Sequence, residues 1–585
     1  MKQEAKGNGG PGKSRRCFRP RLVEVMRGNY SRMDLTGDMM AGVTVGMIAL
    51  PLALALGIAS VPQGVETAFP APALGIFTAI IGGFLISVFG GSRVQIGGPT
   101  AAFIPIILLV IEQHGYGGLL VATMMAGVLL VVMGLARMGS LIKYIPWPVT
   151  SGFTTGIAVA IMATQTGDFF GIHTDDAPPR EFLERMHWLV EHVGSAHVPT
   201  VLLAIVSLVV ILVWPKFGWK RVPGSIVAMV VATIAVMVTG WDSAGGIATI
   251  GSKFGEGAIP ARLPGFAFPA FSLDTVRDLM GPALAIAVLG SIESLLSAVV
   301  ADGLCDDRHD SNTELVAQGI ANLTCPLFGG LPVTGAIART SANVNNGGKS
   351  PVSGIVHAVT LLGIVLVFGR WATHVPMAAM SAVLVFVALR MGEWHELARL
   401  RRMPASDALV LVATFLLTVI FDLVVAVEVG MVLAAMLFIK RVADTTEVSR
   451  VSSEDVLERP EQLAHGKEIP DGVLVFRIFG PFLFGAAEKM QDAIERAEIQ
   501  PRVLILRLHL VTAMDATALN ALESVVERVR KHGGVVVLSG LHRQPLDTLR
   551  KAGFVEVVGR ANLVAHFDDA LARAREVMAD EEAGA

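Results

Sequence analysis

The chain has 585 residues, of which 53% are hydrophobic and 17% are charged, with a mean hydropathy of +0.60. Soluble chains are about 25% charged, so the composition and repeated apolar runs of about 20 residues indicate a multi-span membrane protein. The formal net charge of −3 says little about partners, and we expect no nucleic acid among them. Its three cysteines form neither a disulfide framework nor a metal-binding pattern.

The N-terminal and membrane parts differ in composition. Residues 1–38 are basic and lack the apolar core of a signal peptide, so we expect a cytoplasmic N-terminal segment. Residues 39–440 form the predicted transmembrane domain. Its apolar runs predict fourteen crossings, two of them short, at 39–60, 70–90, 99–111, 117–136, 147–166, 198–214, 222–240, 279–301, 313–328, 335–344, 352–369, 373–389, 406–422 and 424–439.

The distribution of lysine and arginine predicts the orientation. With the N-terminus inside, the cytoplasmic links carry more of these residues than the external links, whose basic residues lie mostly in the two longest loops. The positive-inside rule therefore favours a multi-pass protein of the cell inner (cytoplasmic) membrane, with both ends of the chain in the cytoplasm.

The chain becomes polar after the last crossing. We predict a linker at 441–469, a small domain at 470–575 and an acidic tail at 576–585. Within the domain, β-rich runs such as 473–478 and 503–508 alternate with amphipathic helical runs. This alternation predicts a cytoplasmic α/β domain with a largely parallel sheet.

Two glycine-broken stretches indicate an internal duplication. Gly98 and Gly335 are 237 residues apart, each at the start of a short crossing. The crossings divide into seven plus seven, and an odd number per half gives the halves opposite orientations. Paired broken helices in such an inverted repeat point to a substrate site near the bilayer midplane.

Helix N-termini give that site its expected chemistry. They expose unpaired N–H groups and a partial positive charge. Pro99 suits a helix start, Thr100 adds a hydroxyl, and Gly335 and Ala336 let backbone approach a ligand closely. Two N-termini that face each other would bind an anion without a side-chain cation.

Glu293 is an unusual residue for the centre of an apolar run, where an ionisable group costs about 2.5–3.5 kcal/mol. It could bind a proton or cation that couples to anion movement, with Ser297 on the same helix face, or it could be a structural carboxylate paired with Arg339. Arg339 in turn could raise the potential of the anion site or only pair with an acid.

We find no motif for a cofactor, a metal or an enzymatic nucleophile. The stretch Gly347-Gly348-Lys349-Ser350 resembles the end of a P-loop, but Asn343 occupies a position where that loop requires glycine. Ion gradients are therefore the expected energy source.

Several motifs resemble those of the SulP (sulfate permease) family of anion permeases. They are the first-crossing stretch 38–46 with Pro51, the third-crossing start 97–100 and the tenth-crossing stretch 335–343. Residues 470–575 resemble the STAS domain that follows the membrane part in this family. The resemblance implies a secondary active anion transporter that is no enzyme, with core and gate domains that move in an elevator-like step, as a homodimer.

Within the family, stretches 290–296 and 338–344 are most similar to bacterial C4-dicarboxylate carriers of the succinate-uptake type. That similarity implies dicarboxylate uptake, with sulfate or bicarbonate as alternative substrates. It also implies substrate binding between crossings one, three, eight and ten, for which the candidate residues are Leu52, Gly98, Thr100, Ala101, Gly335, Ala336, Ile337 and Ala338.

The coupling ion is inferred from departures from a family pattern. Bicarbonate carriers of the family use an Asp and a Thr for sodium where this chain has Glu293 and Ser297. Ile337 also replaces a threonine there, and Leu52 follows Pro51 where several members have a polar residue. The differences at Glu293, Ser297 and Ile337 favour symport with protons over symport with sodium. Leu52 indicates that the first crossing contributes mainly to the shape of the binding site.

The STAS-like domain resembles bacterial anti-sigma-factor antagonists, in which a phosphorylated serine lies two residues after an Asp. Thr517 occupies that position after Asp515, so it is either a regulatory phosphosite or simply a helix-start residue capped by Asp515. A cytoplasmic protein could bind this domain. Two rival functions remain: an anion-sensing membrane scaffold that signals through the STAS domain, and a nucleobase permease.

Overall fold

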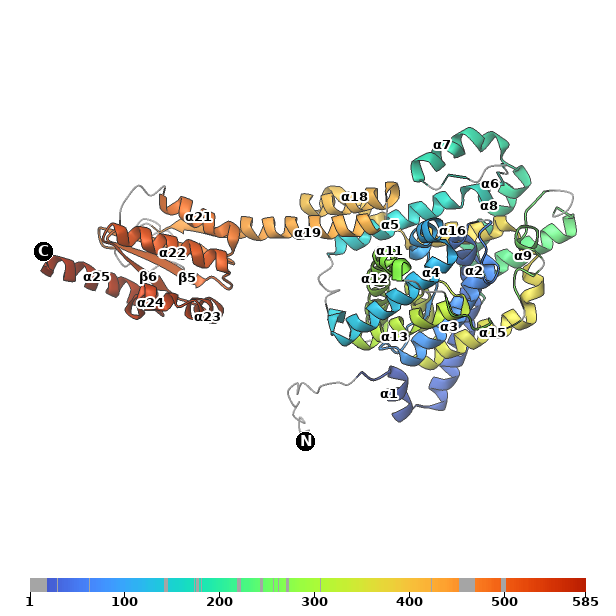
Figure 1. Cartoon of the computed structure of the whole chain (residues 1–585), viewed down its shortest axis with the longest axis horizontal. Helices are drawn as coiled ribbons and strands as arrows, with labels where there is room; N and C mark the ends of the chain where they lie inside the picture. Colours follow the sequence, from blue (N-terminus) through green and yellow to red (C-terminus); the bar gives the residue numbers. More distant parts are fainter. Residues whose placement is uncertain are drawn as a thin grey trace. The chain divides into compact units, whose positions relative to one another are not determined.

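A computed structural model describes residues 18–584 apart from short gaps, and it divides the chain into two compact units, Met1–Met431 and Val432–Ala585. The two units are coloured in sequence order in Figure 1. The gaps are residues 29, 63, 141–145, 173, 175–177, 180, 218–221, 242–245, 256, 261, 263, 270–272, 306, 422, 452–468 and 496–500.

The first unit is built almost entirely of helices (Figure 1). Its longer helices are α2 (Arg32–Ser60), α3 (Ala71–Phe89), α4 (Ile104–Leu135), α5 (Trp147–Thr164), α7 (Phe182–His192), α8 (Val198–Val213), α9 (Gly224–Thr239), α12 (Met280–Cys305), α13 (Ser311–Thr324), α14 (Ile337–Asn345), α15 (Pro351–Ala372), α16 (Met377–Met391) and α18 (Ala405–Ile420), and α19 (Leu423–Thr445) continues into the second unit. Shorter pieces are α1 (Arg21–Arg27), α6 (Thr166–Phe170), α10 (Ile250–Phe254), α11 (Leu273–Asp278), α17 (Trp394–Ala398), η1 (Ala101–Phe103), η3 (Val193–Ser195), η4 (Trp214–Phe217), η5 (Cys325–Phe328) and η6 (Leu400–Arg402).

Each predicted crossing coincides with helix. Among the described residues, six helices are long and apolar enough to cross a bilayer alone, and three shorter apolar helices accompany them. The third and fourth crossings form one element, η1 plus α4, which bends where Gly115 has a φ of 70°. Helix α2 starts at Arg32, before the predicted 39, because Ser31 and Asp34 cap it reciprocally.

Helix contacts in the first unit repeat between its two halves. Helix α2 packs on α15 in the way that α12 packs on α4. Likewise, α3 packs on α15 in the way that α13 packs on α4. In a second group of helices, α5 packs on α18 as α16 packs on α8. Each match exchanges a crossing with the one seven later, which is the contact pattern of an inverted repeat.

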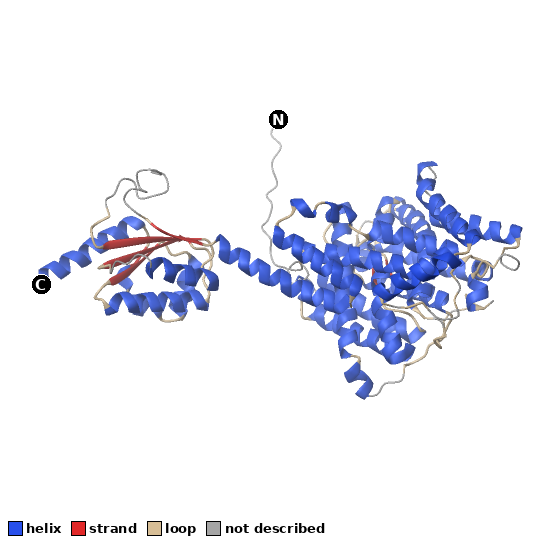
Figure 2. Ribbon diagram, turned by 90° about the horizontal axis from the view of Figure 1, so that it is seen from above, coloured by secondary structure: helices blue, strands red, loops and turns tan. Residues whose placement is uncertain are grey.

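The second unit is an α/β domain, shown with its strands in red in Figure 2. Strands β3 (Glu447–Arg450), β4 (Val473–Phe479), β5 (Val503–Leu510), β6 (Val535–Ser539) and β7 (Leu563–Val564) form one sheet in that order, and only β3 is antiparallel to its neighbour. The helices are α21 (Phe484–Glu495), α22 (Ala516–Lys531), α23 (Arg543–Lys551), α24 (Phe554–Val558) and α25 (Phe567–Gly584), with a short turn η7 (Arg560–Asn562). One face of the sheet packs against α21 to α24, and the other face packs against α25.

Two features of this unit differ from the predicted boundaries. Strand β3 lies inside the predicted linker, because pairing with β4 makes a strand of four residues that have no strong β pattern of their own. Helix α25 runs through most of the predicted acidic tail, since Val577 and Met578 pack against the sheet.

Candidate anion site between two interrupted helices

The two glycine-broken stretches lie side by side in the structure. Strand β1 (Gly97–Gly98) pairs antiparallel with β2 (Thr334–Gly335), with Gly97 opposite Gly335 and Gly98 opposite Thr334. The offset of 237 residues relates Gly97 to Thr334 and Gly98 to Gly335, so the repeat maps each of the two pairs onto the other. The axis of the repeat therefore passes between the two pairs. The start of the third crossing therefore meets the start of the tenth, as the duplication predicts.

Glycine is required at both strands because neighbouring side chains fill the space of a Cβ. A Cβ on Gly98 would overlap Nη1 of Arg339, and one on Gly335 would overlap the amide of Gln95. Gln95 is held there because its Nε2 donates to the Ser294 carbonyl at 3.1 Å. Strand β1 packs against α3, and strand β2 packs against α12.

Both helices that follow the strands start without a side-chain cap. Neither Thr100, before η1 and α4, nor Ala336, before α14, has a side chain bonded to the first N–H groups of its helix. These N–H groups also lack intrahelical partners. Thr100, Ala101 and Ala336 are buried, whereas Ile337 is 38% exposed and Ala338 is exposed too.

Glu293 of α12 reaches the start of the third crossing. The Thr100 hydroxyl donates to Oε2 of Glu293 at 2.8 Å, which explains why Thr100 does not cap its own helix. Among the residues that the structure describes, Glu293 and Arg339 are not within the 4.0 Å of an ion pair. The partner of Glu293 is therefore a hydroxyl at the predicted site rather than a cation.

Arg339 joins the two interrupted stretches. It is 2% exposed, and its Nη2 donates to the Pro99 carbonyl at 2.6 Å. Its Nη1 is buried and has no hydrogen-bond partner among the described atoms. A buried guanidinium with one unsatisfied nitrogen gives this region a positive potential and a donor for an anion.

Ser297 is tied to α14. Its hydroxyl lies 3.1 Å from that of Thr340, which accepts a hydrogen bond from the Ile96 backbone N–H. Leu52, by contrast, is partly buried in a hydrophobic cluster with Ile211 and Val383 of α8 and α16. These positions make Ser297 a link within the site and Leu52 a contact with the second group of helices.

Sequence reasoning left two buried hydroxyls out of the candidate site residues. Thr334 donates to the Gly290 carbonyl at 3.1 Å, and Ser294 accepts a hydrogen bond from the Gly335 backbone N–H at 3.2 Å. Each directly adjoins a residue that the sequence singled out, but its role depends on the strand pairing. His357 was also missed; it is fully buried, and both ring nitrogens lack a partner in the described structure.

Thr517 belongs to the second unit. It is exposed in the first turn of α22, where the Asp515 side chain accepts a hydrogen bond from the Ala518 backbone N–H at 2.8 Å. Asp515 is therefore the cap of α22, and the Thr517 hydroxyl is open to solvent.

Comparison with known proteins identifies the family. A model of the sulfate permease family matches residues 35–414, and a model of the STAS domain matches residues 466–571. The chain belongs to the sulfate permease (SulP) family. It is an anion transporter with a C-terminal STAS domain and not an enzyme, and it is a multi-pass membrane protein.

Relatives of this permease span almost its whole length. The "Putative sulfate transporter YvdB" of Bacillus subtilis is 41% identical over 541 residues, which cover 92% of this chain and 98% of that protein. The "Bicarbonate transporter BicA" of Synechocystis is 30% identical over 541 residues, covering 90% and 92%. These names agree with the family resemblance and with its sulfate and bicarbonate alternatives, but they do not support the dicarboxylate subtype.

Solved structures share the fold of the permease. The anion transporter Slc26a9 of mouse superposes with a TM-score of 0.83 at 18% identity, covering 98% of this chain and 96% of that chain. The transmembrane domain of a cyanobacterial BicA is 30% identical with a TM-score of 0.57, covering 69% and 97%. The predicted fold, a helical membrane transporter with a C-terminal STAS domain, is confirmed.

Proposed function

We propose that this permease carries a small inorganic oxyanion, sulfate or bicarbonate, across the cytoplasmic membrane together with a proton. The observation that carries the proposal is the meeting of two uncapped helix starts at β1 and β2, with Glu293 bonded to Thr100 beside them.

Anion binding would use backbone and guanidinium donors together. The backbone donors would be the first N–H groups of η1, which follows Thr100, and of α14, which follows Ala336. Arg339 adds a fixed positive charge with an unsatisfied Nη1. Such donors suit a compact oxyanion, because each oxygen can accept more than one hydrogen bond.

Proton coupling follows from the charge of Glu293. An ionised carboxylate bonded to Thr100 would repel an anion held by the adjacent N–H groups, and a protonated one would not. Loading the anion and loading the proton are therefore favourable together. Glu293 has a proton-accepting side chain at this position, while Ile337 offers no oxygen for sodium.

The choice of substrate rests on relatives rather than on donor geometry. Backbone N–H groups can donate to any small anion, so the site by itself does not separate sulfate from a C4 dicarboxylate. The sulfate and bicarbonate names of YvdB and BicA support the inorganic alternative over succinate. The cytoplasmic placement of the STAS domain, the homodimer and the elevator-like step stay predictions.

One transport experiment tests this function. Purified permease in proteoliposomes should accumulate radiolabelled sulfate or bicarbonate, and an acidic outer bath should accelerate sulfate uptake without sodium. Succinate uptake that outpaces both inorganic anions would overturn the substrate proposal. Absence of saturable flux for all three anions would instead favour the anion-sensing scaffold.

A further inference from the structure

Four polar side chains form a row across the STAS sheet, which we call the arginine row. Ser449 of β3 lies opposite Arg477 of β4, Arg477 lies opposite Arg507 of β5, and Arg507 lies opposite Ser539 of β6. Directly opposite residues share a sheet face. This face is the one covered by α25, because Val475 and Ile505, two residues earlier on their strands, pack there.

Arg507 is packed against an aromatic ring, but two of its hydrogen-bond donors have no acceptor in the described structure. It is only 7% exposed, and its guanidinium lies 4.4 Å from the ring centroid of Phe567 at the start of α25. Its Nε and Nη1 are buried without a hydrogen-bond partner, as is Nε of Arg477. The described residues provide no carboxylate within ion-pair distance of either guanidinium.

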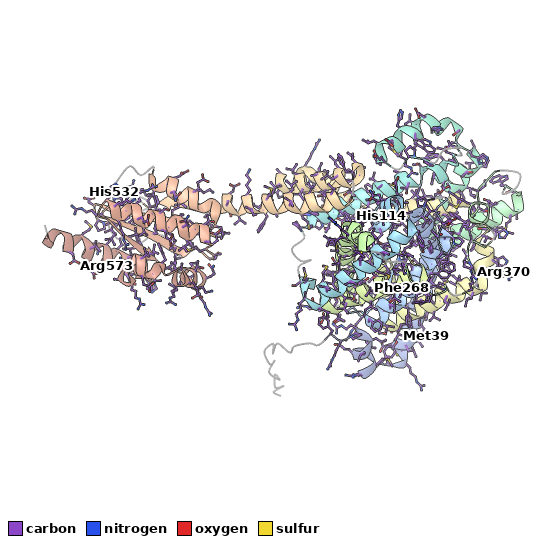
Figure 3. All side chains as sticks on the ribbon, viewed as in Figure 1. Met39, His114, Phe268, Arg370, His532 and Arg573 are labelled. Atoms are coloured by element: carbon purple, nitrogen blue, oxygen red, sulfur yellow. The ribbon has the colours of Figure 1, made fainter. Side chains whose placement is uncertain are left out.

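This arrangement is costly for a folded domain without a ligand. Like charges directly opposite on neighbouring strands repel each other, and buried charged donors without acceptors are strongly unfavourable. Arg573 of α25, labelled in Figure 3, shows the usual outcome: it donates to Asn562 at 3.1 Å and to Glu576 at 3.0 Å. The arginine row lacks such acceptors.

The surroundings of the arginine row are positively charged. Arg477, Arg507 and Ser539 lie in the carboxyl-terminal halves of three neighbouring parallel strands. His509, two residues further along β5, has its pKa lowered by burial and by the positive charges of Arg507, Arg477 and His542. The local potential is therefore positive.

We propose that the arginine row is a binding site for the phosphate or sulfate group of a soluble ligand. Two guanidinium groups can each bind a tetrahedral oxyanion through paired N–H donors, and the Ser449 and Ser539 hydroxyls can supply further donors. Phe567 orients Arg507 by stacking. The site lies in the STAS unit, so it is separate from the transport site and does not depend on the proposed transport function.

Hydrogen exchange on the full chain in phosphatidylcholine nanodiscs tests this site, with inorganic phosphate and inorganic sulfate as probes. We expect either anion to protect peptides from β4, β5 and the start of α25 in a saturable way. A second arm adds phosphatidylglycerol without free anion. Protection in that arm alone would assign the site to a lipid headgroup and overturn a soluble ligand.

Three variants make the test specific. Arg477→Gln removes the half-buried arginine and should weaken anion binding by about tenfold or more, since a charged hydrogen bond is lost. Arg507→Lys keeps the charge but loses the paired donors, so it should also weaken binding. Arg543→Gln is the matched control, because that side chain is 97% exposed, and it should bind like the wild type.

Several outcomes would contradict the proposal. If Arg477→Gln retains wild-type anion affinity with unchanged exchange in the absence of anion, or if the wild type shows no protection of these peptides, the arginines are structural and the proposal is wrong. Protection confined to the peptides of α4, α12 and α14 would report the transport site alone and would equally overturn it.

Discussion

At the scale of single residues, Glu293 links the anion site to a proton. Glutamine at this position keeps an oxygen to accept the Thr100 hydrogen bond but cannot change its charge. We therefore expect Glu293→Gln to bind sulfate yet to lose the acceleration of uptake by an inward proton gradient. Radiolabelled uptake in proteoliposomes with and without the gradient measures this.

The matched control for that variant is Glu66→Gln, which makes the same chemical change at an exposed position. It should keep the full response to the proton gradient. If Glu293→Gln responded to the gradient as the wild type does, Glu293 would not be the coupling group.

Gly98 gives a second test at residue scale. A methyl group at this position would overlap Nη1 of Arg339 and lie 3.2 Å from its Cζ, so the guanidinium must shift away from Pro99. Overpacking of this kind costs about 1–3 kcal/mol, and we expect Gly98→Ala to slow sulfate uptake by about tenfold or more.

Gly117→Ala provides the comparison for Gly98→Ala, because a Cβ at Gly117 meets no atom within 4 Å. Both variants should elute as folded protein on size exclusion, and only Gly98→Ala should lose uptake. Equal uptake by the two variants would contradict the tight fit between Gly98 and Arg339.

Sequence reasoning reached some residues of the site because their chemistry is unusual for a membrane. A carboxylate in an apolar run and glycines that interrupt one are visible without a structure. Ser294 was not counted among the site residues because a hydroxyl in a helix such as α12 ordinarily bonds its own backbone. Thr334 was missed because it lies in β2, whose pairing with β1 is not visible in the sequence, and in the structure its hydroxyl meets that of Ser294. Leu52 was included among the site residues because of the family resemblance around Pro51. In the structure it packs with residues of α8 and α16.

At the scale of elements, the start of α22 separates a structural cap from a regulatory hydroxyl. Asp515 caps the helix through the Ala518 N–H, whereas Thr517 is exposed. Asp515→Ala should destabilise the STAS unit by about 1 kcal/mol, measured as a lower urea midpoint and faster hydrogen exchange in the first turn of α22.

Thr517→Ala is the control in the same turn and should leave both measurements nearly unchanged. A larger loss of stability from Thr517→Ala than from Asp515→Ala would show that the hydroxyl, not the carboxylate, holds the helix start.

Helices were easier to predict than the strands that join or cover them. Apolar length alone marks a candidate membrane helix, and the structure has a helix at every predicted crossing. Strands β1 and β2 have two residues each, and β3 has four. Segments so short carry no periodicity, and their conformation is set by a partner strand that is distant in sequence.

At the scale of the whole molecule, the duplication determines which elements contact each other as well as the number of helices. The same offset relates the paired strands to each other and relates helix contacts in one half to those in the other. The sequence predicted the offset from two glycines, but not which helices would form the group around α12 and which the group around α16. That division depends on packing between apolar faces, which are similar in all of these helices.

The distribution of lysine and arginine predicts a definite orientation in the membrane, which cysteine labelling can check. With the N-terminus inside, α7 lies outside and η6 lies in the cytoplasm. Glu191 of α7 and Arg401 of η6 are both exposed, so single cysteines are tolerable at either position. In a background without Cys17 and Cys305, an impermeant maleimide should label Glu191→Cys in intact cells and Arg401→Cys only after permeabilisation. The opposite pattern would place the STAS domain outside the cell, and the orientation predicted from the charge distribution among the links would then be wrong.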